Sequence, residues 1–473
     1  MSKQRPVRIG AEQVTTADDL VVRSPYDGHE IARVPSCDSS HVGRAVDLGR
    51  ACLGTPIPPW RRAEILDAAA EAIRRRRDEL ATTIAEEAAK PIRTARVEAE
   101  RTVSTFQAAA VEARTLAGDI VPIEGAAAGE GKLAFTLRVP RGVVGAIAPF
   151  NFPLNLVAHK VAPAIAAGCP VVLKPASQTP LSSILLQDIL MDECGLPPGW
   201  LSVVTGSGRA VGDPLVEHPE VAVITFTGSP EVGWAIAAKA ARKEVGLELG
   251  NNAPLIIEPS GDWETAAAKV SVAGFSHAGQ SCISTQRVYV HRSIVDAFSS
   301  ALVSKVRDLV VGPPLDEATD VSSLISGAET ERVRSWIREA VAAGATVLTG
   351  GEVIDGVLTP TVLRDVTAEM EVCRSEVFGP VVSLIAYDDL DSALDQANDT
   401  RYGLQAAIFT ADLAAALRAA RELDFGGVLV NEVPTFRSDP MPYGGVRDSG
   451  NTKEGPHYAV RTMTRERLVI VQA

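Results

Sequence analysis

Short apolar runs and helical repeats alternate through the middle of the chain. The apolar runs lie at 143–148, 171–174, 201–205, 221–226 and 254–257, and helical patterns separate them at 155–167, 181–193 and 230–242. Strands that alternate with helices in this way form parallel sheets through βαβ units. Residues 141 to 258 are therefore predicted to form a doubly wound parallel sheet.

The same alternation continues, less regularly, in the second half of the chain. Strands are predicted at 287–290, 345–348, 381–387, 405–409 and 427–430, and helices at 294–309, 329–343, 390–398 and 412–422. The pattern indicates a second α/β domain.

The remaining segments have other patterns. Residues 1–60 are mixed and rich in turns, which predicts an irregular entry segment. Apolar positions at helical spacing between 61 and 118, interrupted at Pro91, predict two or three helices. Two short strand patterns that flank a glycine-rich turn within 119–139 predict a projecting hairpin. A final strand at 467–471 is expected to pair with this hairpin or with another subunit.

Composition narrows the possible partners. The 473 residues include 59 acidic and 46 basic side chains, a net charge of −13, which argues against nucleic acid or an anionic membrane as the main partner. No apolar run reaches the roughly 18 residues of a membrane span, and the start of the chain lacks the apolar core of a signal peptide. A soluble cytoplasmic protein is expected.

The six cysteines, at positions 37, 52, 169, 194, 282 and 373, have no CxxC pair or regular spacing. No metal site is therefore expected, and the thiols are expected to be reduced. Cys282 is distinct because it follows a Gly-Gln-Ser turn and precedes the strand-like Arg287-Val-Tyr-Val290 after a short polar linker. We interpret it as a nucleophile, although a small buried hydrophobe is the alternative for any single cysteine. A nucleophilic thiol needs a neighbouring base or a lowered pKa, which the amides of a helix N-terminus can supply.

Six motifs, in their order along the chain, resemble those of the aldehyde dehydrogenase superfamily. The similarity extends to Pro442-Tyr-Gly-Gly-Val446 near the end of the chain. The six motifs are Pro149-Phe-Asn-Phe-Pro153, Lys174-Pro-Ala-Ser177, Phe226-Thr-Gly-Ser229, Leu247-Glu-Leu-Gly250, Gly279-Gln-Ser-Cys282 and Glu376-Val-Phe-Gly-Pro380. The resemblance implies an NAD(P)-dependent, non-phosphorylating enzyme that oxidises a small aldehyde to its carboxylic acid.

The resemblance also implies the domain organisation of the aldehyde dehydrogenase fold, which is an α/β fold. A doubly wound parallel-sheet domain for the cofactor is expected from 1–118 and 141–246, and a second α/β domain for catalysis from 247–440. A small β arm for oligomerisation is expected from 119–140 and 455–473. The arm implies a homodimer or a homotetramer.

Three residues carry the chemistry that the resemblance implies. Cys282 would form a thiohemiacetal with the aldehyde, and its oxyanion would be held by the Asn151 amide and the Cys282 backbone N–H. After hydride transfer, Glu248 would activate the water that hydrolyses the thioester. Taken alone, Asn151 is more often a turn cap and Glu248 a surface residue, so the assignment depends on the motifs together.

The resemblance assigns further residues to the cofactor. Lys174 is similar to the lysine at the adenosine ribose, and the helix that opens at Gly228 and Ser229 has N-terminal amides suited to the pyrophosphate. Glu376 and Phe378 are similar to the pair at the nicotinamide ribose. The residues implied at the cofactor are Lys174, Ser177, Gly228, Ser229, Glu376, Phe378 and Phe150.

Ser177 bears on the choice between NAD and NADP. Many members of the family have Glu at this position, and a carboxylate there repels a 2′-phosphate. Ser177 removes that repulsion, and the run to Pro180 is similar to that of NADP-linked succinate-semialdehyde dehydrogenases.

The nearby Gly206-Ser-Gly208-Arg-Ala-Val-Gly212 resembles a dinucleotide-binding fingerprint, but its last glycine is one residue late, so it is interpreted as a turn. Asn251 stands where Gly is usual and has no functional interpretation from sequence.

Four basic residues are expected at the mouth of a substrate pocket: His159, Arg101, Arg287 and Arg437. The position of His159 carries an Arg in the succinate-semialdehyde enzymes, which argues against succinate semialdehyde itself. The pattern agrees better with the lactaldehyde, glyceraldehyde-3-phosphate and phosphonoacetaldehyde enzymes, whose substrates are short and polar or anionic. Each of the four is otherwise an ordinary surface or helix-contact residue.

Two alternative functions remain open at this point. A relative that transfers the acyl group to coenzyme A would not need a water-activating carboxylate, so Glu248 argues against it. A catalytically silent structural or binding protein of the same fold is the second alternative. The presence of Asn151, Glu248 and Cys282 argues against that one.

Overall fold

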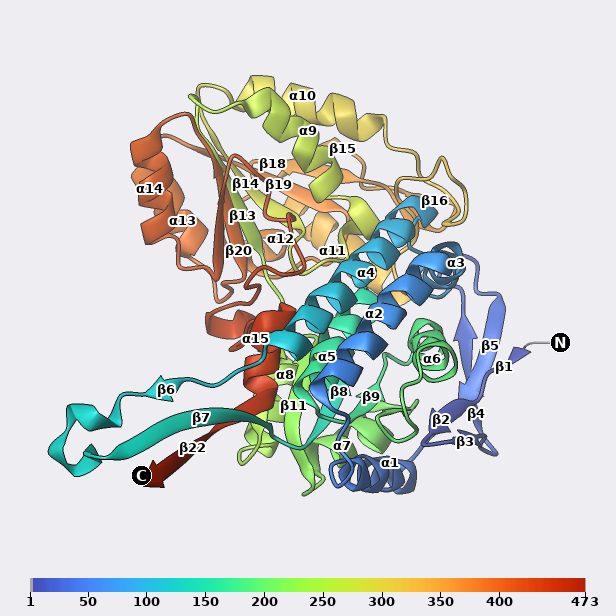
Figure 1. The fold of residues 1–473 in the computed structure, drawn as a ribbon. Helices are drawn as coiled ribbons and strands as arrows, with labels where there is room; N and C mark the ends of the chain where they lie inside the picture. Colours follow the sequence, from blue (N-terminus) through green and yellow to red (C-terminus); the bar gives the residue numbers. More distant parts are fainter. Residues whose placement is uncertain (1–2, 473) are drawn as a thin grey trace.

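The computed structural model describes residues 3–472, which form two large sheets, one parallel and one mainly parallel, and a projecting arm (Figure 1). The first sheet has five strands in the order β10-β9-β8-β11-β12, all parallel. Its strands are β8 Val143–Ile147, β9 Val171–Lys174, β10 Leu201–Val203, β11 Val221–Thr227 and β12 Glu244–Glu248. Its helical segments are α5 Asn155–Ala167, α6 Leu181–Asp188 with a π-helical turn at Ile189–Glu193, a second π-helical turn at Gly208–Gly212, α7 Asp213–Glu217 and α8 Pro230–Lys239. The doubly wound parallel sheet predicted from the alternation is confirmed.

Strand β12 is the one member of this sheet that the apolar pattern did not predict. Its five residues, Glu-Val-Gly-Leu-Glu, include two carboxylates and a glycine, and the strand lies at the sheet edge. Edge strands tolerate such polar composition because one side lacks a neighbouring strand. The prediction of 254–257 as the next strand of this sheet was wrong, because that segment opens the second sheet.

The second sheet has seven strands in the order β15-β18-β19-β14-β13-β20-β21, of which only β15 is antiparallel to its neighbour. The strands are β13 Ala253–Ile257, β14 Thr285–His291, β15 Thr346–Thr349, β18 Thr361–Arg364, β19 Val381–Tyr387, β20 Gln405–Phe409 and β21 Gly427–Val430. The helices are α9 Trp263–Ala273, α10 Val295–Arg307, α11 Gly327–Ala342, α12 Glu371–Arg374, α13 Leu390–Asn398 and α14 Leu413–Glu422, and β16 Val353–Ile354 pairs with β17 Val357–Leu358. The second α/β unit is confirmed, and α9, α12, β16, β17 and β18 are elements that the sequence did not predict.

The first 60 residues are more regular than the sequence predicted. Two small sheets precede helix α1 Ser39–Cys52, whose N-terminus is capped by the Asp38 side chain. The strands are β1 Lys3–Gln4, β2 Val7–Ile9, β3 Glu12–Val14, β4 Asp19–Arg23 and β5 Glu30–Pro35. These strands are short, so their two-residue periodicity is hard to recognise. Three helices follow, as predicted: α2 Pro59–Arg75, α3 Arg77–Ala88 and α4 Ile92–Thr115.

An arm of three antiparallel strands extends away from the body (Figure 1). Strand β7 Lys132–Pro140 pairs on one side with β6 Ile120–Val121 and on the other with β22 Thr464–Gln472, which follows helix α15 Pro456–Met463. The predicted pairing of the C-terminal strand with the hairpin is confirmed. Several large apolar side chains of the arm are exposed, namely Ile120, Leu133, Leu137, Leu468 and Ile470.

Two separate hydrophobic cores lie around the two sheets. Strands β8, β11 and β12 are adjacent in the first sheet, so their carboxyl ends at Ile147, Thr227 and Glu248 lie side by side. Ligands of open parallel sheets bind at this edge. The sequence motifs that follow these strands are therefore brought together. No helix among the described residues is long and apolar enough to cross a membrane.

Candidate active site

The segment before Cys282 has an unusual backbone that fixes the position of the thiol. His277, Ala278 and Gly279 all have positive φ values, of 50°, 54° and 71°. A Cβ atom on Gly279 would lie 2.1 Å from the Gly379 carbonyl oxygen, so only glycine fits this close approach. The chain then turns through Cys282 into strand β14. The Cys282 Sγ lies 2.9 Å from the Tyr443 hydroxyl oxygen.

A helix N-terminus, one possible means of lowering the thiol pKa, does not follow Cys282 in the described structure. The next element after Cys282 is strand β14, not a helix. Burial raises the pKa of the Cys282 thiol to about 12, and the hydrogen bond with Tyr443 acts in the opposite direction. The protein must therefore stabilise the thiolate by other means if Cys282 is the nucleophile.

Asn151 lies in the turn between β8 and α5, and its backbone and side chain are both held. Its Nδ2 donates to the Gln280 carbonyl at 2.9 Å, which fixes the amide next to the Cys282 segment. Its carbonyl accepts from Lys90 Nζ at 2.6 Å, and Lys90 forms a buried ion pair with Glu98. The other Glu98 oxygen accepts the Leu154 N–H at the start of α5. One amide hydrogen of Asn151 remains for an oxyanion, as an oxyanion hole requires.

Glu248 lies at the end of β12 with an unusual carboxyl group. The side chain is buried, and neither carboxyl oxygen has a hydrogen-bond partner within the described residues. Burial, followed by the negative charge of Glu454, raises the pKa of Glu248 well above its ordinary value. A buried carboxyl with a raised pKa is suited to take a proton from water near neutral pH.

A cavity of about 520 Å³ brings the three catalytic candidates together, because Cys282, Asn151 and Glu248 all line it. Its volume is in the range of small-molecule sites. Five of the predicted cofactor residues line the same cavity: Phe150, Gly228, Ser229, Glu376 and Phe378. The structure thus unites segments that lie more than two hundred residues apart in sequence.

The residues of this cavity fit a nicotinamide dinucleotide. Helix α8 begins directly after Gly228 and Ser229 and directs its N-terminal N–H groups to this edge of the sheet, where phosphates bind. A Cβ on Gly228 would lie 2.5 Å from the Phe226 ring, so this tight turn needs glycine. The rings of Phe150 and Phe378 meet edge to face at 5.8 Å. Their apolar surfaces suit a nicotinamide ring.

The other two cofactor candidates lie beyond the cavity wall. Lys174 Nζ donates to the Pro175 carbonyl at 3.1 Å, and burial lowers the pKa of Lys174 to about 8. Ser177 Oγ donates to the Gly206 carbonyl at 3.0 Å. Ala176, which lies between them in sequence, does line the cavity. Both side chains pack beside the 206–212 run, which forms a bend at Gly206 and a π-helical segment at Gly208–Gly212 where a simple turn was predicted.

A second group of buried charges lies next to Glu248, and we call it the charged layer. It consists of Arg101, His159, Lys160, Arg437, Asp439 and Glu454. Three of the four predicted substrate residues belong to this layer, but each already has a carboxylate partner. The layer therefore differs from the open pocket mouth that the sequence suggested.

Asp439 joins two of these basic residues. His159 Nε2 lies 3.0 Å from Asp439 Oδ1, and Arg101 Nη2 lies 2.8 Å from the same oxygen. Burial acts to raise the pKa of Asp439, but the hydrogen bond with His159 and the charge of Arg101 keep it well below its usual value. Burial lowers the pKa of His159, which favours its neutral form. The side chain of Arg101 is 24% exposed and that of His159 is fully buried, so of these two only Arg101 is accessible to a ligand.

Almost the whole chain is similar in sequence to known proteins. The model of the aldehyde dehydrogenase family matches residues 13–469. The chain belongs to the aldehyde dehydrogenase family. It is 45% identical to the 3-sulfolactaldehyde dehydrogenase of Priestia megaterium over 469 residues, which cover 99% of this chain and 98% of that protein. The predicted family and enzyme class are confirmed.

Solved structures of the family support the fold and the cofactor. Aldehyde dehydrogenase 21 from Physcomitrella patens, in complex with its product succinate, superposes with a TM-score of 0.96 at 37% identity, covering 100% of this chain and 99% of that one. The glyceraldehyde-3-phosphate dehydrogenase of Methanocaldococcus jannaschii, in complex with NADP, gives a TM-score of 0.93 at 38% identity, covering 97% and 100%. The predicted aldehyde dehydrogenase fold and the cofactor class, NAD or NADP, are confirmed.

Arg287 does not reach the active site of this aldehyde dehydrogenase, so the expectation that it binds substrate is not retained. Its side chain is buried in the second sheet and donates to the carbonyl oxygens of Asn252, Gln396 and Ala397. A further donor meets the Tyr289 hydroxyl at 2.9 Å. These bonds use the guanidinium to tie β14 to neighbouring segments.

Asn251, which had no interpretation from sequence, connects the two halves of the enzyme. Its backbone N–H donates to the Glu376 carboxylate at 3.0 Å, and its Nδ2 donates to the Gln405 carbonyl at 3.2 Å. Burial raises the pKa of Glu376 to about 7. Asn251 thus links the segment after β12, through its backbone, to the cavity residue Glu376 and, through its side chain, to β20.

Several residues around the site were missed in the sequence. Tyr443 lies inside one of the family motifs, but the sequence did not predict a role for it. Asp439 and Glu454 lie in loops, where a carboxylate is usually solvated. Lys90 and Glu98 are eight residues apart, and the sequence pattern around them is that of an ordinary amphipathic helix, which does not reveal their ion pair. Only Tyr443 had a usable signal, since it lies in the Pro442-Tyr-Gly-Gly-Val446 motif.

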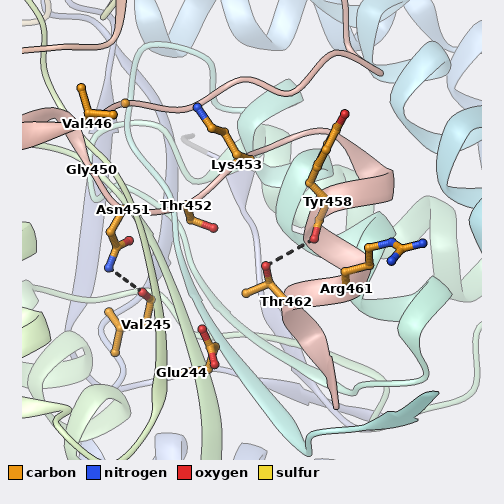
Figure 2. A pocket seen from close by; sticks show the side chains of 11 residues that line it. Glu244, Val245, Val446, Gly450, Asn451, Thr452, Lys453, Tyr458, Arg461 and Thr462 are labelled. Carbon is orange, nitrogen blue, oxygen red and sulfur yellow. Dashed lines mark hydrogen bonds between the residues drawn. The ribbon is translucent and has the colours of Figure 1, made fainter. Parts of the chain in front are cut away.

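A second cavity, also of about 520 Å³, lies between β12 and α15 (Figure 2). None of the candidate catalytic or cofactor residues lines it. Asn451 Nδ2 donates to the Val245 carbonyl at 3.1 Å, and Thr462 Oγ1 donates to the Tyr458 carbonyl at 3.3 Å (Figure 2). These polar groups are engaged with the backbone, so we assign this cavity no part in the reaction.

Proposed function

We propose that the enzyme oxidises a short aldehyde with an anionic end group to its carboxylate, with Cys282 as nucleophile, Asn151 at the oxyanion and Glu248 as general base. One observation carries this proposal: the three side chains line a single cavity although they come from three distant segments. The presence of a buried, unpaired carboxyl in the same cavity as the thiol favours hydrolysis over transfer to coenzyme A.

The steps follow from the chemistry of these groups. The Cys282 sulfur forms a bond to the aldehyde carbon, and the carbonyl electron pair moves onto oxygen, where the Asn151 amide and the Cys282 N–H donate to it. The cavity residues Gly228, Ser229, Glu376 and Phe378 would hold NAD or NADP, which would supply the acceptor for the hydride lost from that carbon. Glu248 then takes a proton from water as the water oxygen bonds to the thioester carbon. The carbon–sulfur bond breaks, which releases the carboxylic acid and the Cys282 thiolate.

Two observations support a short anionic substrate. The names of three relatives refer to short molecules with an anionic group, namely 3-sulfolactaldehyde, succinate and glyceraldehyde 3-phosphate. In this chain Arg101 is the partly exposed cation of the charged layer, and Asp439 holds it in place. We propose Arg101 as the contact for the anionic group and His159 and Arg437 as its support. The sulfonate of 3-sulfolactaldehyde is the first candidate.

The cofactor assignments and domain boundaries are part of the same proposal. Gly228 and Ser229 would hold the pyrophosphate, Glu376 and Phe378 the nicotinamide ribose, and Lys174 and Ser177 the adenosine ribose. The parallel five-stranded sheet supports a cofactor domain at 1–118 and 141–246. The seven-stranded sheet supports a catalytic domain within 247–440.

The arm supports assembly into a homodimer or homotetramer. Its β22 is an edge strand with exposed Leu468 and Ile470, and an exposed apolar edge favours pairing with another chain. We assign residues 119–140 and 455–473 to this oligomerisation arm. Six unpaired cysteines support a reducing compartment, the cytoplasm, as the place of action.

The test is a panel of aldehydes assayed with NAD and with NADP. 3-Sulfolactaldehyde, glyceraldehyde 3-phosphate, succinate semialdehyde and lactaldehyde are compared with hexanal and benzaldehyde, and products are identified with and without coenzyme A. We expect the highest kcat/KM for a short anionic aldehyde and a free carboxylate as the product. A preference for hexanal or benzaldehyde over every short aldehyde would contradict the proposal, as would acyl-coenzyme A as the product.

A further inference from the structure

The thiol of Cys282 has one hydrogen-bonding partner in the described structure, and that partner is the Tyr443 hydroxyl. The Sγ and Oη atoms lie 2.9 Å apart, and the hydroxyl makes no other hydrogen bond among the described residues. Among residues 3–472, neither a histidine nor the first turn of a helix forms a hydrogen bond with the sulfur. If Cys282 is the nucleophile, another group must therefore stabilise its thiolate form.

We propose that Tyr443 is a catalytic residue that donates its hydroxyl to the Cys282 sulfur and so stabilises the thiolate before it attacks the aldehyde. The proposal rests on the proposed role of Cys282 as nucleophile and adds the group that prepares it. It also gives a function to the charged layer, which holds Tyr443 in place.

The position of Tyr443 is fixed by backbone hydrogen bonds and by packing of its side chain. Its backbone N–H donates to the Glu454 carbonyl at 3.2 Å, and the Glu454 N–H donates back to the Tyr443 carbonyl, as in a short antiparallel bridge. The side chain is only 2% exposed and packs with Ile283 and Leu404. Its hydroxyl is thus preorganised toward the sulfur, so little ordering is needed when the thiolate forms.

Arg437 strengthens this donor. Its guanidinium carbon lies 3.9 Å from the centre of the Tyr443 ring, which is a close cation–π contact, and Glu454 holds the guanidinium at 2.7 Å. A cation on the ring face draws electron density from the phenol and makes its O–H a better donor. Arg437 therefore acts through Tyr443, as a positioning residue.

Either the thiol or the phenol can donate in this hydrogen bond while Cys282 is protonated, but its direction is fixed once the thiolate forms. Burial raises the pKa of Tyr443 well above its ordinary value, so the phenol keeps its proton. A protonated phenol next to a thiolate can only donate to it, and hydrogen bonds to charged partners are the stronger ones. The other charged groups near the sulfur act in both directions: Arg437 favours the thiolate, whereas Glu376 and Glu454 oppose it, and Glu248 lines the same cavity.

The experiment is Tyr443→Phe, which removes only the hydroxyl and keeps the ring under Arg437. The rate of Cys282 alkylation by iodoacetamide is measured across pH, with Cys282→Ala as the blank for the other five thiols. We expect the apparent pKa of the thiol to rise by about one unit, and alkylation at neutral pH to slow about tenfold. The first-turnover burst of reduced cofactor should slow by a similar factor.

Tyr387→Phe is the matched control, because it also removes a buried hydroxyl, which bonds to the Ile257 carbonyl at 3.1 Å in the second sheet. It should leave both rates unchanged. A Tyr443→Phe enzyme that unfolds at the wild-type temperature but keeps the wild-type alkylation profile would overturn the proposal, even if its turnover falls. If Cys282→Ala itself retained turnover, the proposed function would fail, which is a separate outcome.

Discussion

The cofactor side of the site, which contains the cavity, and the charged layer differ in whether their buried carboxyl groups have basic partners. On the cofactor side, Glu248 and Glu376 line the cavity without an ion pair among the described residues, and burial raises the pKa of each. In the charged layer, Asp439 and Glu454 are paired with Arg101 and Arg437. Although burial opposes it, Arg437 lowers the pKa of Glu454 to about 2. Burial thus raises the pKa of the two carboxyl groups in the cavity, whereas basic neighbours lower the pKa of the two in the charged layer.

This difference separates two tasks. A carboxyl group with a raised pKa can accept a proton from water, which is the work proposed for Glu248. A carboxylate with a lowered pKa instead holds cations in fixed positions, as Asp439 holds Arg101 and Glu454 holds Arg437. In the proposed mechanism, the cofactor side would provide the proton acceptor, and the charged layer would provide fixed charges for the substrate and for Tyr443.

The largest expected effect is from Cys282→Ala, which removes the proposed nucleophile. Turnover should fall by roughly 10⁴-fold or more, since a covalent mechanism has no substitute for the thiol. NADP binding, measured by fluorescence titration, should stay close to wild type, because the cofactor contacts come from other residues. A variant that lost cofactor binding as well would mean that the two sides are not independent.

Glu248→Gln should separate acylation from deacylation. Steady-state turnover should fall by about 10² to 10⁴-fold, the usual value of a general base, while the burst of reduced cofactor is retained. In the wild type, Glu248 must lose its proton to act, so kcat should rise with pH through its raised pKa. Pre-steady-state absorbance and a pH profile of kcat check both points. A slowed burst in the variant would assign Glu248 to activation of the thiol.

The two sides also differ in how far the sequence predicts them. Gly228, Ser229, Glu248 and Cys282 lie in short motifs at strand or turn ends, so local patterns together with the family resemblance located them. Asp439 and Glu454 depend on pairing between distant segments, such as Arg101 with Asp439 across 338 residues. No local pattern encodes such a pair. The prediction for Arg287 failed for the same reason, because a basic residue at a strand start does not reveal which carbonyl oxygens surround it.

Arg101→Gln tests whether the charged layer selects anionic substrates. 3-Sulfolactaldehyde and lactaldehyde share a three-carbon hydroxyaldehyde and differ in the sulfonate. Loss of one charge-assisted hydrogen bond, about 1.5–3 kcal/mol, should lower kcat/KM for 3-sulfolactaldehyde by about 10 to 100-fold and leave lactaldehyde nearly unchanged. Arg96→Gln, on the same helix and paired with Glu317, is the control. Equal losses for both substrates would assign Arg101 to structure instead of specificity.

Ser177→Glu tests the cofactor side with the smallest expected effect. Ser177 lies beside the 206–212 run and near Lys174, where a carboxylate would face the 2′-phosphate of NADP across partly solvated space. Repulsion between two close unit charges in water is about 1 kcal/mol. The KM for NADP should therefore rise by roughly fivefold, while the KM for NAD stays level or falls. Ser177→Gln adds similar bulk without charge and should leave the ratio of the two KM values near that of the wild type. If Gln and Glu raise the KM for NADP equally, bulk and not charge governs the adenosine end, and the 2′-phosphate does not bind against Ser177.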